Sequence, residues 1–306
     1  MAPLRHKDYT VGWVCVLPIE FAASIKLLEE KHQSLPQRNG DSNSYALGCI
    51  SDHNVVIVSR PVTEASASPI SAAVVVENLV SAFPHIRFIL LVGVGSGVPS
   101  LKADIRLGDV VVGTPGRKHE GVIQYYVGGT GAEEIFQHTG SPNLPPNILL
   151  GAMARLRTDE TLGEGDFAGL LRKLSNQASL RETRRDVLFS PTYNHVGGSS
   201  CDSCDNTYSI ERTPRPNNGP VAHYGLIASV NAIIKDTVAR DRLASEIGGV
   251  ICFEAEAAGM NNDLPCLTIR GIADYGDSHK NELWLWYAAL AAASYAAWLL
   301  VYTPTV

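Results

Sequence analysis

Apolar runs of strand length alternate with helical periodicity along the first half of the chain. Helical spacing of apolar side chains covers 19–32 and 68–84. The strand-like runs, each bounded by turn residues, cover 10–18, 43–50, 53–61, 86–99, 107–115 and 122–129. Strands that alternate with helices predict a layered α/β domain.

The second half is at first more polar and then returns to core-like patterns. Helical periodicity covers 143–185, and the excursion 191–220 is rich in Gly, Pro, Ser and Asn, as in a long loop or a pocket cover. The run at about 281–302 is long enough to cross a bilayer, but its many alanines favour a buried terminal helix, with no membrane contact. Without a repeat or a linker, residues 1–306 are expected to form a single domain.

Composition and charge narrow the class of protein. The chain has 306 residues, 45% of them hydrophobic, and a formal net charge of -6, which suits an acidic, enzyme-sized domain. No basic run or arginine-aromatic stripe indicates nucleic-acid binding. Six cysteines are too few for a disulfide framework, and the N-terminus lacks the features of a secretory signal. We therefore expect a cytoplasmic protein whose partner is a small-molecule substrate.

Two glutamates stand out in the small, apolar run ICFEAEAAGMN, from Ile251 to Asn261. If this run starts as a strand, Glu254 and Glu256 point to the same face. A carboxylate in such surroundings needs a partner, because burial of an unpaired charge is costly. The pattern indicates a site in which carboxylates hold a ligand.

Three further features carry weaker signals, each with an ordinary structural alternative. The stretch VGVGSGVPS, from Val92 to Ser100, follows a strand and either lets a ligand approach the backbone or forms a tight turn. Asp274 follows a buried strand, as a general acid or as a turn residue. Glu20 opens a helix, where the helix dipole favours any acidic side chain.

Cys201 and Cys204 form a C-x-x-C pair, with His195 six residues upstream of Cys201. Most structural zinc sites have four ligands, and the sequence has no second pair of this kind. The pattern favours a loop that carries two thiols, so no metal and no cofactor are expected.

Seven motifs, taken in order, resemble the nucleoside phosphorylase and nucleosidase superfamily, which includes purine nucleoside phosphorylases, uridine phosphorylases and methylthioadenosine/S-adenosylhomocysteine nucleosidases. They are GWVCVLPIEFAAS, HNVVIV, FPHIRFILLVGVGSGVPS, DIRLGDVVV, HYGLIAS, CFEAEAAG and IRGIADYGDSHKN. The similarity covers nearly the whole chain and is closest to the fungal branch. It implies a three-layer α/β/α fold with a central mixed, partly barrel-like sheet, assembled as a homo-oligomer (dimer, trimer or hexamer).

The resemblance also implies roles for the acidic residues. Glu256 would accept hydrogen bonds from the ribose 2' and 3' hydroxyls, with Glu254 close by, because one carboxylate can accept two donors. Asp274 would protonate the leaving purine at N7, and Glu20 would position and deprotonate the attacking water. The other residues of the substrate site would be Ala255, Ala273, Gly95, Ser96, Val230, Ile233 and Arg270.

Hydrolysis is favoured over phosphorolysis for this chain. Phosphorylases of this superfamily carry an arginine and a serine around the glycine loop, and the matching positions here are Leu91 and Val94. Without a cation or a donor, removing a phosphate dianion from water would be costly. Arg270 or Arg60 would then be the remaining sources of positive charge.

Three pocket positions depart from the pattern of the superfamily. Ala255 replaces a methionine, Ala273 replaces a serine or cysteine, and Val230 replaces a glycine. Two alternatives to a purine nucleosidase therefore stay open. One is a fungal metabolic enzyme, as in secondary metabolism, that uses the same carboxylates for isomerisation, cyclisation or elimination on a more apolar substrate. The other is a ligand-sensing module.

Overall fold

The computed structural model describes residues 4–60, 69–128, 135–140, 144–165, 167–175, 185–198, 200–215, 219–232, 234–257 and 265–305. Its strands are β1 (Val11–Cys15), β2 (Glu30–Lys31), β3 (Ser44–Ile50), β4 (His53–Ser59), β5 (Phe88–Gly97), β6 (Val110–Gly113), β7 (Val122–Gly128), β8 (Ile135–Gly140), β9 (Ala222–Val230), β10 (Val250–Glu254) and β11 (Cys266–Asp274). Its helices are α1 (Pro18–Ile25), α2 (Pro69–Ala82), α3 (Asn147–Leu162), α4 (Phe167–Ser175), α6 (Thr237–Ile247) and α7 (Leu285–Tyr302), with short 3-10 turns η1 (His6–Asp8) and η2 (Asn206–Tyr208).

The eleven strands of the described residues form one sheet, part of which closes on itself. β5 pairs with β11, β11 with β6, β6 with β9, β9 with β10, and β10 with β5 again. This closed circuit is the barrel-like part of the sheet, and β1, β4, β3 and β2 extend from it. Both parallel and antiparallel pairs occur, so the mixed, partly barrel-like sheet implied by the sequence motifs is confirmed.

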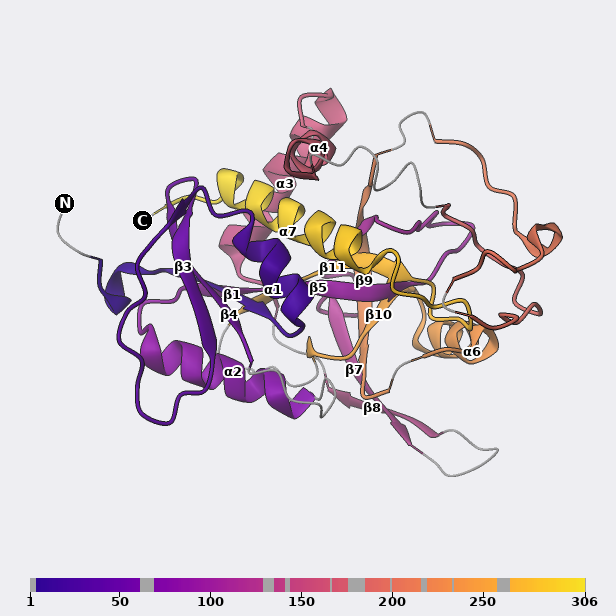
Figure 1. Cartoon of the computed structure of the whole chain (residues 1–306), viewed down its shortest axis with the longest axis horizontal. Helices are drawn as coiled ribbons and strands as arrows, with labels where there is room; N and C mark the ends of the chain where they lie inside the picture. Colours follow the sequence, from indigo (N-terminus) through magenta and orange to yellow (C-terminus); the bar gives the residue numbers. More distant parts are fainter. Residues whose placement is uncertain are drawn as a thin grey trace.

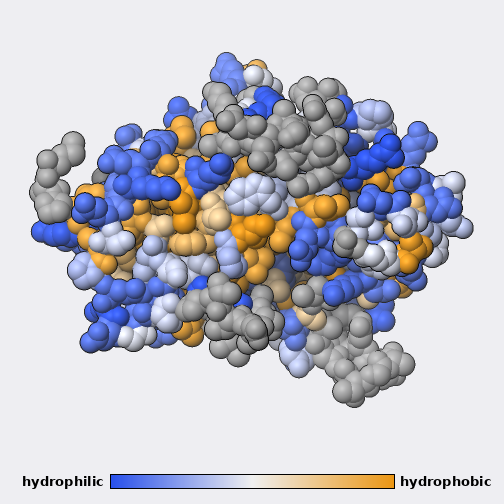
Figure 2. All heavy atoms as spheres, viewed as in Figure 1, coloured by the Kyte–Doolittle hydropathy of each residue, from blue (hydrophilic) through white to orange (hydrophobic). Residues whose placement is uncertain are grey.

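Helices cover both faces of the sheet (Figure 1). α7 lies against β11 and β5, with α1, α3 and α4 packed around it, while α2 packs against β1 and β4. The close approach of α7 requires a glycine, because a Cβ on Gly271 would lie 1.9 Å from the carbonyl oxygen of Ala288. On the face seen in Figure 2, apolar residues are concentrated in the centre, where α1 and α7 lie.

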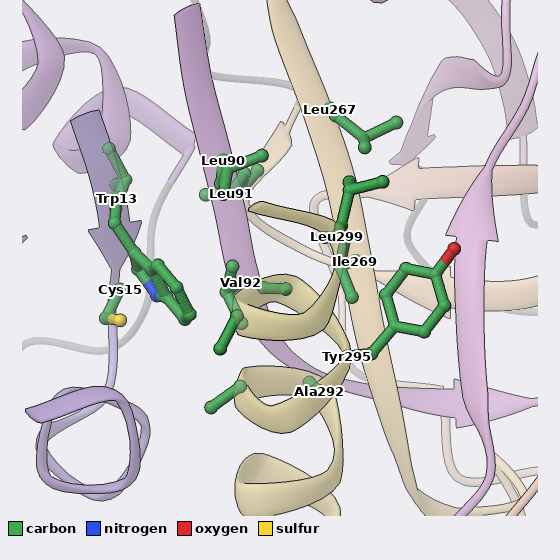
Figure 3. Close-up of a cluster of buried hydrophobic side chains, with 14 of the residues drawn as sticks. Trp13, Cys15, Leu90, Leu91, Val92, Leu267, Ile269, Ala292, Tyr295 and Leu299 are labelled. Carbon is green, nitrogen blue, oxygen red and sulfur yellow. The ribbon is translucent and has the colours of Figure 1, made fainter. Parts of the chain in front are cut away.

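The central strands and α7 share one apolar core. β1 is buried at every position, as expected of a parallel strand that is covered on both faces. Ala292, Tyr295 and Leu299 of α7 lie beside the side chains of β5 and β11, including Val92 and Ile269 (Figure 3). Among the described residues, α7 is the one helix long and apolar enough to span a membrane, and 72% of that stretch is buried inside the fold.

The helix predicted over 19–32 is shorter in the structure. α1 ends at Ile25, and the chain then joins the edge of the sheet as β2. The backbone N–H groups of Glu29 and His32 donate to the carbonyls of Cys49 and Leu47 at 3.0 and 2.8 Å. Pairing with the edge of β3 replaces the last helical turns, a tertiary contact that hydrophobic periodicity does not reveal.

Candidate active site

Arg270, in the middle of β11, is the centre of a buried group of charges. Its side chain is fully buried, its Nη2 donates to Glu254 Oε2 at 2.6 Å, and its Nη1 donates to Glu256. Glu20 is the third carboxylate of this group, and its charge acts on both Arg270 and Glu256. We call these four residues the Arg270 cluster. Four of the residues predicted for the site are thereby brought together.

Glu254 and Glu256 reach Arg270 by a turn of the chain rather than by strand alternation. β10 ends at Glu254, and the Glu254 carboxylate then accepts the backbone N–H groups of Glu256 and Ala257, both at 3.0 Å. This contact holds the turn that directs Glu256 towards Arg270. The prediction that both carboxylates point to one face of a strand is wrong, because β10 ends at Glu254, although both carboxylates do contact Arg270.

Glu20 is held by three backbone donors from two elements. It is the third residue of α1, and its Oε2 accepts the N–H groups of Val16 and Leu17 at 3.0 and 2.9 Å, in the manner of a helix capping box. Its Oε1 accepts the N–H of Val94 in β5 at 2.8 Å. A carboxylate offers about four acceptor sites, so roughly one remains for a further donor. The side chain is therefore both capping residue and site residue.

Gly93, the first glycine of the stretch VGVGSGVPS, lies inside β5 and makes room for the protein's own charges. A Cβ on Gly93 would lie 2.4 Å from both Arg270 Nη1 and Glu20 Oε1. A Cβ on Gly95 would lie 2.7 Å from the sulfur of Cys252. The tight turn, one of the two alternatives that the sequence left open, is wrong for Gly93, because Gly93 lies inside β5 and its missing side chain leaves room for Arg270 and Glu20.

Burial and mutual repulsion keep protons on this cluster. Burial raises the pKa of Glu256 from its ordinary 4.5 to about 8, with Arg270 acting against this shift and the charges of Glu20 and Glu254 adding to it. Burial likewise raises the pKa of Glu20, against the charge of Arg270 and the three backbone donors. One guanidinium cannot neutralise three carboxylates, so the cluster can take up and release a proton near neutral pH.

Asp274 lies at the end of β11, beyond a β-bulge. The register against β5 shifts between Ile272 and Asp274, so Ala273 is the extra residue, and such bulges redirect side chains next to functional sites. Asp274 Oδ1 accepts the N–H of Gly276 at 2.8 Å, and Oδ2 accepts from Lys280 Nζ. Asp274 is thus also a turn residue, and among the described residues it has no hydrogen bond to the Arg270 cluster.

A cavity of about 440 Å³ opens beside Asp274. We call it the Asp274 cavity, and it is lined by Leu107, Arg185, Val187, Phe189, Cys201, Asp202, Asn206, Ala273, Asp274, Tyr275, Asp277, His279, Asn281, Leu283 and Trp284. Its volume suits a small-molecule ligand. Ala273 and Asp274 are the two predicted site residues in this lining, and a part of the excursion 191–220 forms one wall.

The remaining predicted positions are spread more widely. Val230, at the end of β9, is 2% exposed in a second apolar cluster that includes Leu243 of α6. Ser96 lies in β5, paired with Phe253 and Asp274. Ala255 follows β10 directly. Ile233 lies outside the described residues.

Several residues around the cavity were missed by the sequence reasoning. Lys280 belongs to the motif IRGIADYGDSHKN, so its place six residues after Asp274 was a signal that could have been used. Tyr275 donates to Asp186 Oδ1 at 2.5 Å and accepts from Arg212 Nη1 at 2.9 Å. Asp186 and Arg212 lie in polar segments and are separated by 26 positions, so no local sequence pattern predicts their contact.

The described residues contain one group that could hold a metal. The ligand atoms of His195, Cys201 and Cys204 all lie within 4.8 Å of one another, and none of these residues belongs to the Arg270 cluster. Burial and the neighbouring Cys204 thiol raise the pKa of Cys201 to about 11.

Comparison of this fold with solved structures gives matches that cover almost the whole chain. The 5'-methylthioadenosine/S-adenosylhomocysteine nucleosidase of Neisseria meningitidis matches over 95% of this chain and 98% of its own, with a TM-score of 0.59 and 15% identity. The corresponding nucleosidase of Colwellia psychrerythraea matches over 98% of both chains, with a TM-score of 0.59 and 16% identity. The futalosine hydrolase of Helicobacter pylori matches over 97% of this chain and 99% of its own, with a TM-score of 0.53 and 14% identity.

Comparison of sequences gives a longer fungal relative. A nucleotide-binding leucine-rich repeat (NLR)-like protein of Hyaloscypha variabilis is 39% identical over 303 residues, which is 97% of this chain. The chain spans 30% of the length of that relative. No protein-family model matches the sequence. The chain has the fold of the nucleoside phosphorylase and nucleosidase superfamily, as its motifs imply.

Proposed function

We propose that this chain, which has a nucleosidase-like fold, hydrolyses the N-glycosidic bond of a purine nucleoside of the adenosine type. The observation that carries the proposal is the Arg270 cluster. Glu20 comes from α1, Glu254 and Glu256 come from the end of β10 and the turn after it, and all three converge on one buried guanidinium. Burying several charges in one desolvated space costs free energy of folding, and such groups are concentrated at functional sites. We therefore infer that the cluster serves a ligand.

Glu256 is the residue that binds the sugar. Its side chain is 7% exposed, whereas that of Glu254 is fully buried, and its hydrogen-bond partner among the described residues is Arg270. It can therefore accept two vicinal hydroxyls while Arg270 holds it in place. Glu254 is a positioning residue, because its oxygens are occupied by Arg270 and by the turn that follows.

Glu20 orients and deprotonates the attacking water. Three backbone donors fix its carboxylate and leave room for about one more donor, which is what a single water requires. Its raised pKa moves it towards the range in which a general base works near neutral pH.

Asp274 supplies the proton to the leaving base. It lines the cavity, and Lys280 Nζ donates to its second oxygen. Asp274 takes up a proton from solvent before the reaction and gives it to the purine N7. This leaves Asp274 as a carboxylate, whose negative charge the ammonium of Lys280 neutralises. Protonation of the base removes the developing negative charge on the leaving group as the glycosidic bond breaks.

The charges around the glycine loop support hydrolysis rather than phosphorolysis. Arg270, which the sequence left as a source of charge for phosphate, is engaged by Glu254 and Glu256. The N–H of Val94 is engaged by Glu20. A phosphate dianion beside Arg270 would meet the acidic side chains of Glu20, Glu254 and Glu256. Neither Arg270 nor the N–H of Val94 would be free to donate to it, and like charges in a buried site repel strongly.

The apolar part of the cavity favours a second candidate, an acid/base enzyme for a less polar substrate. Phe189, Trp284, Leu107 and Val187 contribute to the lining beside Asp274. The Asp274–Lys280 pair could move a proton in an isomerisation or elimination without any sugar being present.

The test is release of free base from adenosine, inosine, guanosine, uridine and methylthioadenosine, each with and without phosphate, followed by chromatography. Release of purine without phosphate is expected. Asp274→Asn should lower the rate by roughly 10²- to 10⁴-fold, the usual contribution of a general acid. Asp52→Asn, in the exposed turn between β3 and β4, is the matched control and should leave the rate unchanged. Release that requires phosphate, or no release from any nucleoside, would contradict the proposal.

A further inference from the structure

We propose that His195, Cys201 and Cys204 bind a zinc ion that fastens residues 189–198 and 200–209 beside the Asp274 cavity. The three ligand atoms lie within 4.8 Å of one another. In a tetrahedral zinc site with Zn–S bonds of about 2.3 Å, two sulfurs lie about 3.8 Å apart, so small side-chain rotations would complete the geometry. Two thiolates and an imidazole are ligands that select zinc among the common divalent cations. The site does not depend on the proposed reaction.

The hydrogen bonds of His195 match those of a metal-binding imidazole. Its Nε2 lies 3.0 Å from the carbonyl oxygen of Ser200, and because a carbonyl only accepts, Nε2 carries the proton. Nδ1 is then the unprotonated nitrogen, and it accepts the N–H of Gly197 at 3.1 Å. Metal-bound histidines usually donate their other N–H to a backbone carbonyl or a carboxylate. Zinc would take the place of the Gly197 donor on Nδ1.

Cys204 is buried, and the sulfur of Cys201 contacts a distant segment of the chain. Cys204 is 6% exposed, and the amide Nδ2 of Asn281 lies 3.8 Å from Cys201 Sγ, where it donates to the sulfur. Cys201 Sγ in turn donates to the backbone oxygen of His279 at 3.7 Å. A donor aimed at the sulfur stabilises a thiolate, and it does so in a metal site as well.

His279 is the candidate for the fourth ligand. Its backbone already contacts Cys201, its ring lies 5.6 Å from that of His195, and its Nε2 is buried without a hydrogen-bond partner among the described residues. Its ring is stacked on Phe189 at 4.1 Å. The sequence could not suggest this ligand, because 75 positions separate His279 from Cys204.

Such an ion would tie one wall of the cavity to the turn that carries the acid. Cys201 and His279 both line the cavity, and the sulfur of Cys201 donates to the backbone oxygen of His279. The turn 274–281 also carries Asp274 and Lys280. Zinc would therefore hold together two segments whose direct contacts are otherwise a few hydrogen bonds and ring stacks, so its loss should loosen the cavity.

The experiment measures metal in the full chain, purified without a histidine tag or chelator. Mass spectrometry of the metals should give one zinc per chain, and replacement by cobalt should give the sulfur-to-cobalt charge-transfer band of thiolate ligation. The double variant Cys201→Ser/Cys204→Ser and His195→Ala should each lose the zinc. Cys49→Ser, a partly exposed thiol in β3, is the matched control and should retain it.

A second readout keeps the test independent of variants that fold poorly. A strong chelator should lower the melting temperature of the unaltered chain, and zinc but not magnesium should restore it, since a ligand that binds the folded state stabilises it. His279→Ala should weaken zinc binding if its ring is the fourth ligand. A chain that holds no zinc and has both thiols free for alkylation would overturn the proposal. So would a Cys201–Cys204 disulfide in the freshly purified protein, or equal zinc loss in the Cys49→Ser control.

Discussion

The Arg270 cluster and the Asp274 cavity hold their carboxylates by different means. In the cluster, Glu20 and Glu254 are fixed by backbone N–H groups, and Arg270 is fully buried. In the cavity, Asp274 is held by a turn and by Lys280, whose side chain is 36% exposed. The closed part of the sheet builds the first region, whereas irregular segments build much of the second. In the proposed reaction, the more rigidly held cluster would bind the sugar, and the turns beside Asp274 would leave room for variation where the base binds.

Removal of the positive charge of Arg270 should have the largest effect on the stability of the cluster. Arg270→Met leaves Glu254 and Glu256 buried without a counter-ion, and we expect a loss of about 3–5 kcal/mol in the free energy of unfolding. Urea denaturation measures it. Arg5→Met, at an exposed ion pair, is the control and should change little. A loss in Arg270→Met no larger than in the control would show that the cluster is not held by this ion pair.

Filling the space beside Gly93 should cause the second-largest loss of stability. Gly93→Ala places a methyl group against Arg270 and Glu20, and we expect a loss of about 3 kcal/mol, as for overpacking of a core that also disturbs a buried ion pair. The matched control is Gly151→Ala on the exposed face of α3, where nothing lies within 4 Å of the new methyl. That change should stabilise the helix by up to about 1 kcal/mol. Equal behaviour of the two variants would refute the role of Gly93.

Changes at the cavity should affect rate more than stability. Lys280→Met removes the donor to Asp274, and we expect the rate of base release to fall by roughly 10- to 100-fold, the value of one hydrogen bond to a charged group. The melting temperature should change little, because the lysine is partly exposed. A large drop in melting temperature with an unchanged rate would assign Lys280 a structural role instead.

The pH dependence of stability should give the most specific signal. The pKa of Glu256 in the folded chain is raised to about 8, so its stabilising contribution is fully present below its ordinary pKa of 4.5 and is lost as pH rises through about 8. The melting temperature should therefore decline across this window. Glu256→Gln should flatten the decline, although not abolish it, because the pKa of Glu20 is also raised. A variant with the same slope as the unaltered chain would contradict the shift.

Local patterns were enough to predict many of the strands and to single out Glu20, Glu254 and Glu256, which the structure brings together at Arg270. The apolar run of β1 and the alternation of strands and helices indicated the α/β class, and the ordered motifs implied the barrel-like sheet. The turn at Glu254 and the early end of α1 were not predicted, because each depends on a partner from another part of the chain.

The sequence by itself determined which chemical groups are present: the carboxylates of Glu20, Glu256 and Asp274, and the thiols of the C-x-x-C pair. Only the tertiary structure decided which of them meet. The pairing of β5 with β11 brings Glu20, which is bound to Val94 of β5, to Arg270. The turn after β11 brings His279 to Cys201. The reason is physical, since a side chain's type is local, whereas its partner, its burial and its pKa depend on strand register and on segments far away in the chain.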